Sequence, residues 1–143
     1  AAPKPQLQWG APGPHVAVHV RRGDVSMSVT PLRFTTNGLI ARCVMNVLAR
    51  MSGRGAPKPS VHIFSQGRAA DFGSLLKVPR VRLHLNTPLE STFHHLVSAD
   101  ALVMAKSTLS DCAAFLSEGR IFQQPSTGGG GLLHYVHRTN WRI

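Results

Sequence analysis

The sequence predicts an α/β protein built on a doubly wound, mostly parallel, Rossmann-like sheet. Segments with strand-like and helix-like periodicity alternate through most of the 143 residues, which is typical of parallel strands joined by helices. The composition, 43% hydrophobic and 15% charged, is that of a folded domain with a sizeable core. Residues 1–14 contain four prolines and two glycines and are predicted to be a linker, which leaves residues 15–143 as the domain.

The first strand is expected over residues 15–21, in which valines alternate strictly with other residues. Valines occupy positions 16, 18 and 20 on one face, while His19 and Arg21 share the other face. Arg22 and Gly23 follow where the strand should end. Ligands of open α/β sheets bind outside the carboxyl ends of the strands, and an arginine fork matches a phosphate in bidentate fashion. The stretch therefore predicts a strand followed by an anion-binding turn.

The remaining elements follow from hydrophobic spacing. A helical period predicts a helix over residues 36–52, and shorter helices are expected over 68–77, from Thr87, and from Ser107 to Gly119. Short apolar or alternating runs predict strands over 61–64, 81–85, 101–105 and 120–123. Thr87 is expected to cap its helix in a capping box with Glu90. The two cysteines fall on apolar helix faces and are expected to be buried free thiols.

Two stretches together resemble a known enzyme superfamily. His-Val-Arg-Arg-Gly-Asp, residues 19–24, is similar to the first signature motif of the fucosyltransferases that share the α1,2-, α1,6- and protein O-fucosyltransferase core. Residues 98–110, SADALVMAKSTLS, are similar to the later "ADxLV…SS(F)S" segment of that superfamily. The resemblance implies the donor-binding, C-terminal half of a GT-B enzyme, in which Arg21 binds the diphosphate of GDP-fucose.

The same resemblance carries further expectations. It implies an acceptor half upstream, a glycan or protein hydroxyl as acceptor, and work in the Golgi or endoplasmic reticulum lumen. It implies a reaction without a metal and with no cofactor besides the donor substrate. His19 and Asp100 would contact the donor nucleotide, both at the guanine, although His19 can equally be a half-buried strand histidine without a ligand.

The predicted topology brings polar residues from three strand ends to one edge of the sheet. Ser107 and Thr108 lie at a helix start, where free N–H groups and the helix dipole favour an anion. Helix capping alone also explains both residues, and the two roles are compatible. The candidate binding residues at this edge are Arg21, Arg22, Ser65, Gln66, Ser107 and Thr108.

Catalytic groups are harder to assign than binding groups. Arg21 would stabilise the leaving diphosphate. An inverting sugar transfer usually needs a base for the acceptor hydroxyl, but residues 25–29, Val-Ser-Met-Ser-Val, offer none where some relatives carry a glutamate. The base is then Asp24, lies outside the chain, or is missing. Asp24 can also simply form an ion pair with the arginines.

Charge and composition leave three functions to compare. Sixteen basic residues against six acidic ones give a formal net charge of +10, which indicates an anionic partner. Only 6% of residues are aromatic, which argues against a stacking platform for nucleic acid, so no nucleic-acid partner is expected. No metal motif is present among the eight histidines. The hypotheses are a fucosyltransferase donor half, a non-catalytic nucleotide-sugar-binding module and, third, a basic nucleic-acid-binding domain.

Overall fold

The computed structural model describes residues 7–124 and the backbone of residues 134–135, and it confirms the doubly wound α/β fold. Its sheet has the order β3-β2-β1-β4-β5-β6. Neighbours among β1 to β5 pair in parallel, whereas β6 runs antiparallel to β5. The strands are β1 (His15–His19), β2 (Ser60–Ser65), β3 (Val81–Leu85), β4 (Ala101–Met104), β5 (Arg120–Gln123) and β6 (His134–Tyr135).

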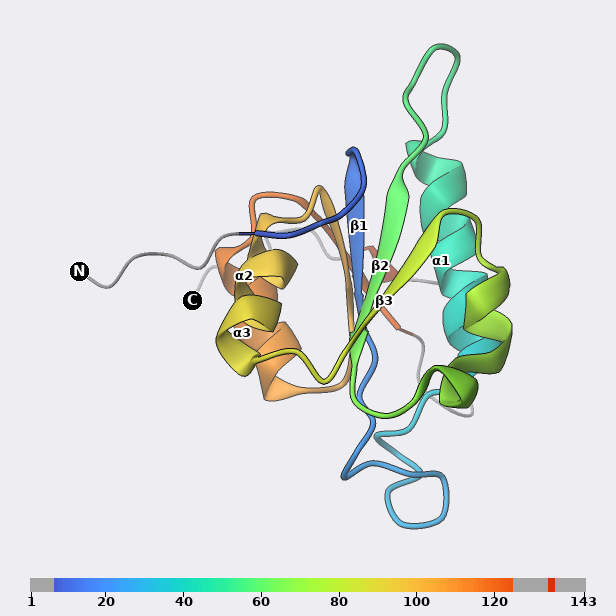
Figure 1. Cartoon of the computed structure of the whole chain (residues 1–143), viewed down its shortest axis with the longest axis vertical. Helices are drawn as coiled ribbons and strands as arrows, with labels where there is room; N and C mark the ends of the chain where they lie inside the picture. The colour runs from blue at the N-terminus through green and yellow to red at the C-terminus, as the bar shows by residue number, and fades with distance from the viewer. Residues whose placement is uncertain (1–6, 125–133, 136–143) are drawn as a thin grey trace, which may run out of the picture.

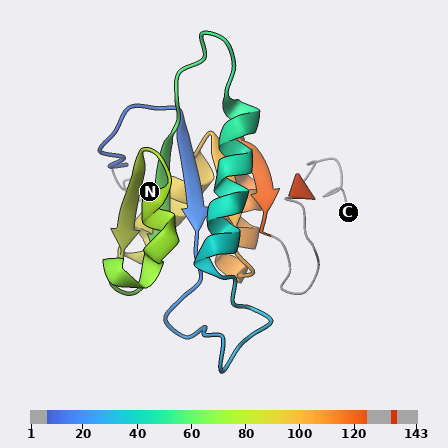
Figure 2. The same ribbon diagram turned by 90° about the vertical axis from the view of Figure 1, so that its right-hand side faces the viewer.

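Helices cover both faces of the sheet. Helix α1 (Asn37–Met51) packs on one face, and α2 (Leu89–Ser98) and α3 (Thr108–Leu116) lie side by side on the other (Figure 1). The segment predicted as a short helix is a 3₁₀ helix, η1 (Ala69–Lys77), kinked at Gly73, which has a φ of 24°. Figure 2 shows α1 in front of the sheet, running along the direction of the strands, with η1 on the same face. Among the described residues, none of the helices has the length and hydropathy to cross a membrane.

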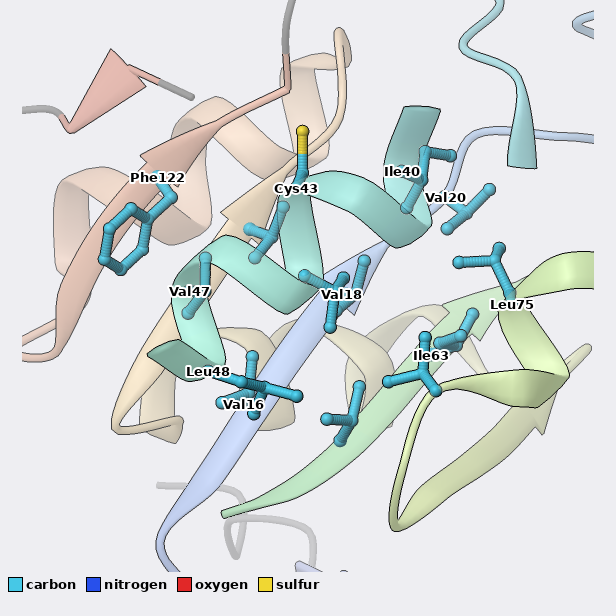
Figure 3. Packing of buried hydrophobic residues seen from close by; sticks show 14 of the residues in the cluster. Val16, Val18, Val20, Ile40, Cys43, Val47, Leu48, Ile63, Leu75 and Phe122 are labelled. Atoms are coloured by element: carbon cyan, nitrogen blue, oxygen red, sulfur yellow. The ribbon is translucent and has the colours of Figure 1, made fainter. Parts of the chain in front are cut away.

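The alternation of β1 decides how the two faces of the sheet are packed. Valines 16, 18 and 20 are fully or almost fully buried against α1, with Ile40, Val44 and Val47 (Figure 3). Ala17 points to the opposite face, where it joins Phe64, Leu96 and Leu102 beneath α2 and α3. The first face is packed by aliphatic side chains together with Phe72 and Phe122, whereas the second also holds histidines. The candidate site draws residues from both sides of this strand, since His19 and Val20 both line it.

The end of the predicted linker packs on the domain. The indole of Trp9 stacks on His15 with ring centroids 4.2 Å apart, and joins the core beneath α2 and α3. Ser60 donates from its hydroxyl to the carbonyl of Pro12 (2.8 Å) and from its backbone N–H to that of Pro14 (2.9 Å). Residues 9–14 therefore differ from a free linker, because the Trp9 side chain packs against the rings of three histidines and Phe64 on the sheet.

Two local expectations need correction. Helix α2 has Pro88 at its N-cap position and no side-chain cap, so the expected capping box of Thr87 is absent. Thr87 is instead hydrogen-bonded to the Thr92 hydroxyl at 2.6 Å. Cys43 is buried, which raises the pKa of its thiol to about 11, but Cys112 is exposed. Burial of Cys112 was wrongly predicted because α3 is apolar around much of its circumference.

Candidate functional site

A cavity of about 230 Å³ opens at the carboxyl ends of β1 and β2. The chain leaves β1 for α1 on one face and leaves β4 for α3 on the other, so the cavity lies at the point where the sheet changes its winding direction. Figure 1 shows the loop after β1 at this end, opposite the loop that joins α1 to β2. Of the predicted site residues, the lining includes His19, Arg21, Arg22, Asp24, Ser65, Gln66 and Ser107.

Arg21 is the arginine that can exchange partners. Its guanidinium donates to the Asp24 carboxylate at 3.1 Å and to the Lys106 backbone carbonyl at 3.3 Å. The Arg21 side chain is 24% exposed and that of Asp24 74% exposed, so both remain open to solvent. An exposed ion pair of this kind contributes little stability and can give way to a stronger anion. The predicted ion pair of Asp24 is confirmed.

Arg22, by contrast, is held by its surroundings. Its guanidinium donates to the carbonyls of Arg21 (2.9 Å) and Thr35 (2.8 Å) and to the side chain of Asn37 (2.9 Å). It also lies over the Phe34 ring, 4.1 Å from the centroid. Burial lowers the pKa of Arg22. These contacts tie the turn after β1 to the start of α1, so Arg22 shapes the site and has few donors left for a ligand.

The turn between these groups depends on Gly23. Its φ of 85° lies in the left-handed region, which glycine adopts without steric cost. A Cβ there would also collide with the side-chain oxygen of Gln66, which lines the cavity from the end of β2. The neighbouring Ser65 is buried, and its hydroxyl donates to the Val20 carbonyl at 2.6 Å. Ser65 thus joins the ends of β1 and β2, while Gln66 faces the site.

The start of α3 forms another wall of the cavity. Ser107 is the N-cap, as predicted, because its side chain accepts from the backbone N–H groups of Leu109 (3.1 Å) and Ser110 (3.4 Å). Ser107 also lines the cavity, so the positive end of the helix dipole is directed at it. Thr108 is exposed and is not among the lining residues. Of the predicted pair, Ser107 alone therefore reaches the cavity.

His19 lies at the cavity end of β1. Its side chain is buried, and burial together with the nearby Arg21 lowers its pKa to about 4. The imidazole is therefore neutral at pH 7. Six cavity residues were missed by sequence reasoning: Val20, Phe64, Thr87, Leu89, Thr92 and Leu109. The loop after β3 and the first turn of α2 gave only a capping signal, and the apolar residues gave only a core signal.

The structure places Asp100 away from His19, although the resemblance implies that both contact the guanine. Asp100 precedes β4, so in a parallel sheet it lies at the amino edge, opposite the cavity. Its carboxylate accepts from the His15 backbone N–H (2.7 Å), and its own N–H donates to the His15 carbonyl (3.0 Å). Asp100 therefore links the amino ends of β1 and β4. A nucleotide bound in the cavity at the carboxyl edge would lie at the opposite edge of the sheet from Asp100.

No metal-binding arrangement occurs within the described part of the chain. There, no group of three or more histidine, cysteine, aspartate or glutamate side chains is placed to hold an ion. The positive groups at the cavity are Arg21, Arg22 and the start of α3.

Comparison with solved structures identifies a glycosyltransferase of similar fold. The fucosyltransferase NodZ from Bradyrhizobium superposes with a TM-score of 0.53 at 18% sequence identity. The match covers 85% of this chain and 41% of the NodZ chain, so this chain spans less than half of that protein. No protein family and no curated protein matches the sequence. The chain thus shares a fucosyltransferase-like, Rossmann-type fold.

Proposed function

We propose that this chain is the donor-binding half of a fucosyltransferase-like glycosyltransferase, which binds GDP-fucose for transfer to a glycan or protein hydroxyl. The observation that carries the proposal is the cavity at the winding change of the sheet, where Arg21 and the capped start of α3 face the same space. Both groups favour a diphosphate. The structural likeness to NodZ, a fucosyltransferase, supports the same assignment.

Arg21 would act on the leaving group. In the free protein it is bonded to Asp24, and a diphosphate would take the place of this exposed carboxylate. Two parallel hydrogen bonds from one guanidinium then match two phosphate oxygens. As the bond to the sugar breaks, negative charge grows on the diphosphate, and Arg21 with the α3 dipole stabilises it without a metal.

The described residues offer a donor site but only a poor candidate for the base that would activate the acceptor hydroxyl. Asp24 is the one carboxylate that lines the described cavity. Its hydrogen bond to Arg21 lowers its pKa, which makes it a poor base. We therefore expect the isolated chain to bind GDP-fucose and to transfer no fucose, with slow donor hydrolysis at most. An acceptor half elsewhere in the protein would supply the rest of the site.

The same pairing of Asp24 favours a second candidate, a non-catalytic nucleotide-sugar-binding module. Calorimetric titration with GDP, GDP-fucose and UDP tests the binding common to both candidates, and saturable binding of GDP and GDP-fucose is expected. Absence of GDP binding would refute both. A radiolabelled-fucose assay with a mixed panel of glycan and peptide acceptors then separates them. Clear transfer by this chain would show that its residues build the acceptor site.

A further inference from the structure

His19 faces the cavity with one side of its ring and is held by α3 on the other. We propose that Ser110 is a positioning residue, which fixes His19 as an Nε2–H donor directed at a hydrogen-bond acceptor of the bound nucleotide. The proposal rests on the function proposed above, and it assigns a role to a serine that does not itself line the cavity.

The contact between the two residues determines where the imidazole proton lies. The Ser110 hydroxyl oxygen is 2.6 Å from His19 Nδ1, and it accepts the Ala105 backbone N–H at 3.0 Å. Ser110 is fully buried, and within the described residues its hydroxyl proton has no acceptor other than His19 Nδ1. Nδ1 therefore accepts, and the proton of the neutral ring is on Nε2.

The backbone of His19 is fixed as well. The side-chain amide of Gln124, at the end of β5, donates to the His19 carbonyl at 2.8 Å. Gln124 is 3% exposed, so this bond is buried. Three separate elements, β1, α3 and the end of β5, thus hold one histidine. Its ring can neither flip nor shift without breaking a buried hydrogen bond, which costs more than breaking an exposed one.

The opposite nitrogen is left for a ligand. His19 Nε2 has no hydrogen-bond partner among the described residues. In this part of the chain, every buried side-chain nitrogen and oxygen has a partner, so an atom without one must be exposed. Nε2 is therefore accessible, and His19 lines the cavity. Arg21, Arg22 and Asp24 are the charged groups that line the same space. A neutral Nε2–H selects an acceptor atom, as on a purine edge that presents only N7 and O6.

The state of the ring can be measured without a ligand. In a nitrogen-15 NMR spectrum of the imidazoles at pH 7, His19 of the wild-type protein should show the Nε2–H tautomer. An Nδ1–H tautomer would overturn the proposal, whether or not the chain binds GDP. Because this measurement uses the unaltered protein, it does not depend on the folding of any variant.

Substitution of Ser110 connects the tautomer to binding. In Ser110→Ala, His19 should become a mixture of tautomers, and GDP affinity should fall about tenfold, the loss expected for one well-placed hydrogen bond. Ser117→Ala is the matched control, because Ser117 is also buried at an end of α3 but accepts from the Gly119 N–H, at 3.0 Å, instead of contacting His19. This control should keep wild-type affinity.

Two outcomes would overturn the assignment of Ser110 while leaving the proposed function intact. One is a folded Ser110→Ala protein with wild-type GDP affinity. The other is an equal loss of affinity in Ser117→Ala, which would mean that any weakening of α3 has the same effect. If the wild-type chain binds no GDP, the proposed function fails, and the NMR result still decides whether Ser110 fixes the ring.

Discussion

His19 and His62 lie on neighbouring strands and on the same face of the sheet, yet their ring nitrogens have different partners. Burial lowers the pKa of both, to about 4 for His19 and about 3 for His62. His19 keeps one nitrogen open to the cavity. Both nitrogens of His62 are bonded to other histidines, to His15 at 3.2 Å and to His84 at 2.9 Å. Burial alone therefore does not make a histidine a binding group, since an accessible nitrogen is also needed.

Trp9 closes the histidine cluster, which comprises His15, His62, His84 and His95. Its ring centroid is 4.2 Å from that of His15 and 4.7 Å from those of His62 and His95. The Gln8 backbone N–H donates to His95 Nε2 at 3.0 Å, and His95 Nδ1 donates to the Ser91 carbonyl at 2.7 Å. Hydrogen bonds and ring contacts thus hold the cluster together as a structural unit. Variants of the cavity should change binding, and variants of the cluster should change stability.

The largest effect is expected at Arg21. Arg21→Ala should lower GDP affinity by roughly 10- to 100-fold, since it removes a charge-assisted bidentate contact. Arg21→Lys should also lose much of the affinity, because a point charge cannot replace the planar fork. Calorimetry checks both, with Arg54→Ala in the exposed α1–β2 loop as a control of equal charge. Equal affinity of wild type and Arg21→Ala would refute the diphosphate site.

The cluster should make the protein sensitive to acid. Three of its members, His15, His62 and His84, have lowered pKa values when folded, so the unfolded state binds more protons as the pH falls below about 6.5. The free energy of unfolding should therefore decrease by about 1.4 kcal/mol per pH unit for each such proton, down to the folded pKa, about 3 for His62. Urea denaturation at pH 7, 6 and 5 measures this slope.

His62→Gln tests the source of that slope, since it removes the cluster member with the most strongly lowered pKa. The variant should show a smaller dependence of stability on pH and unchanged GDP affinity at pH 7. An unaltered pH dependence of stability would mean that other groups cause the acid sensitivity. A loss of GDP binding in the folded variant would mean that the cluster contributes to binding as well as to stability.

Two glycines, one in the turn after β1 and one early in α1, should respond in opposite ways to alanine. Gly23→Ala should destabilise the protein by about 1–2 kcal/mol, because a left-handed backbone is unfavourable for alanine, and should weaken GDP binding by disturbing the turn. Gly38→Ala, early in α1 with no atoms within 4 Å of its new Cβ, should stabilise by about 0.5–1 kcal/mol. Thermal denaturation compares them. A Gly23→Ala protein as stable as wild type would show that the turn tolerates another conformation.

The smallest expected effect is that of chelators. Because arginine and the start of α3 supply the positive charge, EDTA should leave GDP affinity unchanged, as should added Mg²⁺ or Mn²⁺. A titration that requires either ion would show that the cavity needs a charge that its side chains do not provide.

The sequence by itself determined the fold and the edge at which the candidate site lies. Period-2 alternation in residues 15–21 and helical spacing in α1 are local patterns. Each shows, within a few residues of sequence, which side of the element is buried. Parallel strands place their carboxyl ends together, so the positions of Arg21 and Ser107 at one edge could be predicted. The position of Asp100 before its strand already indicates the opposite edge, and only the resemblance suggested otherwise.

The tertiary structure alone decided what each of these side chains does. Arg22 is occupied because Thr35 and Asn37 return to it from the start of α1, which leaves Arg21 as the arginine able to exchange partners. Ser110 meets His19 across 91 residues of sequence. Such contacts leave no periodic signal, because a hydrogen-bond partner is fixed by the packing of whole elements, whereas hydrophobic periodicity reports only which face of one element is buried.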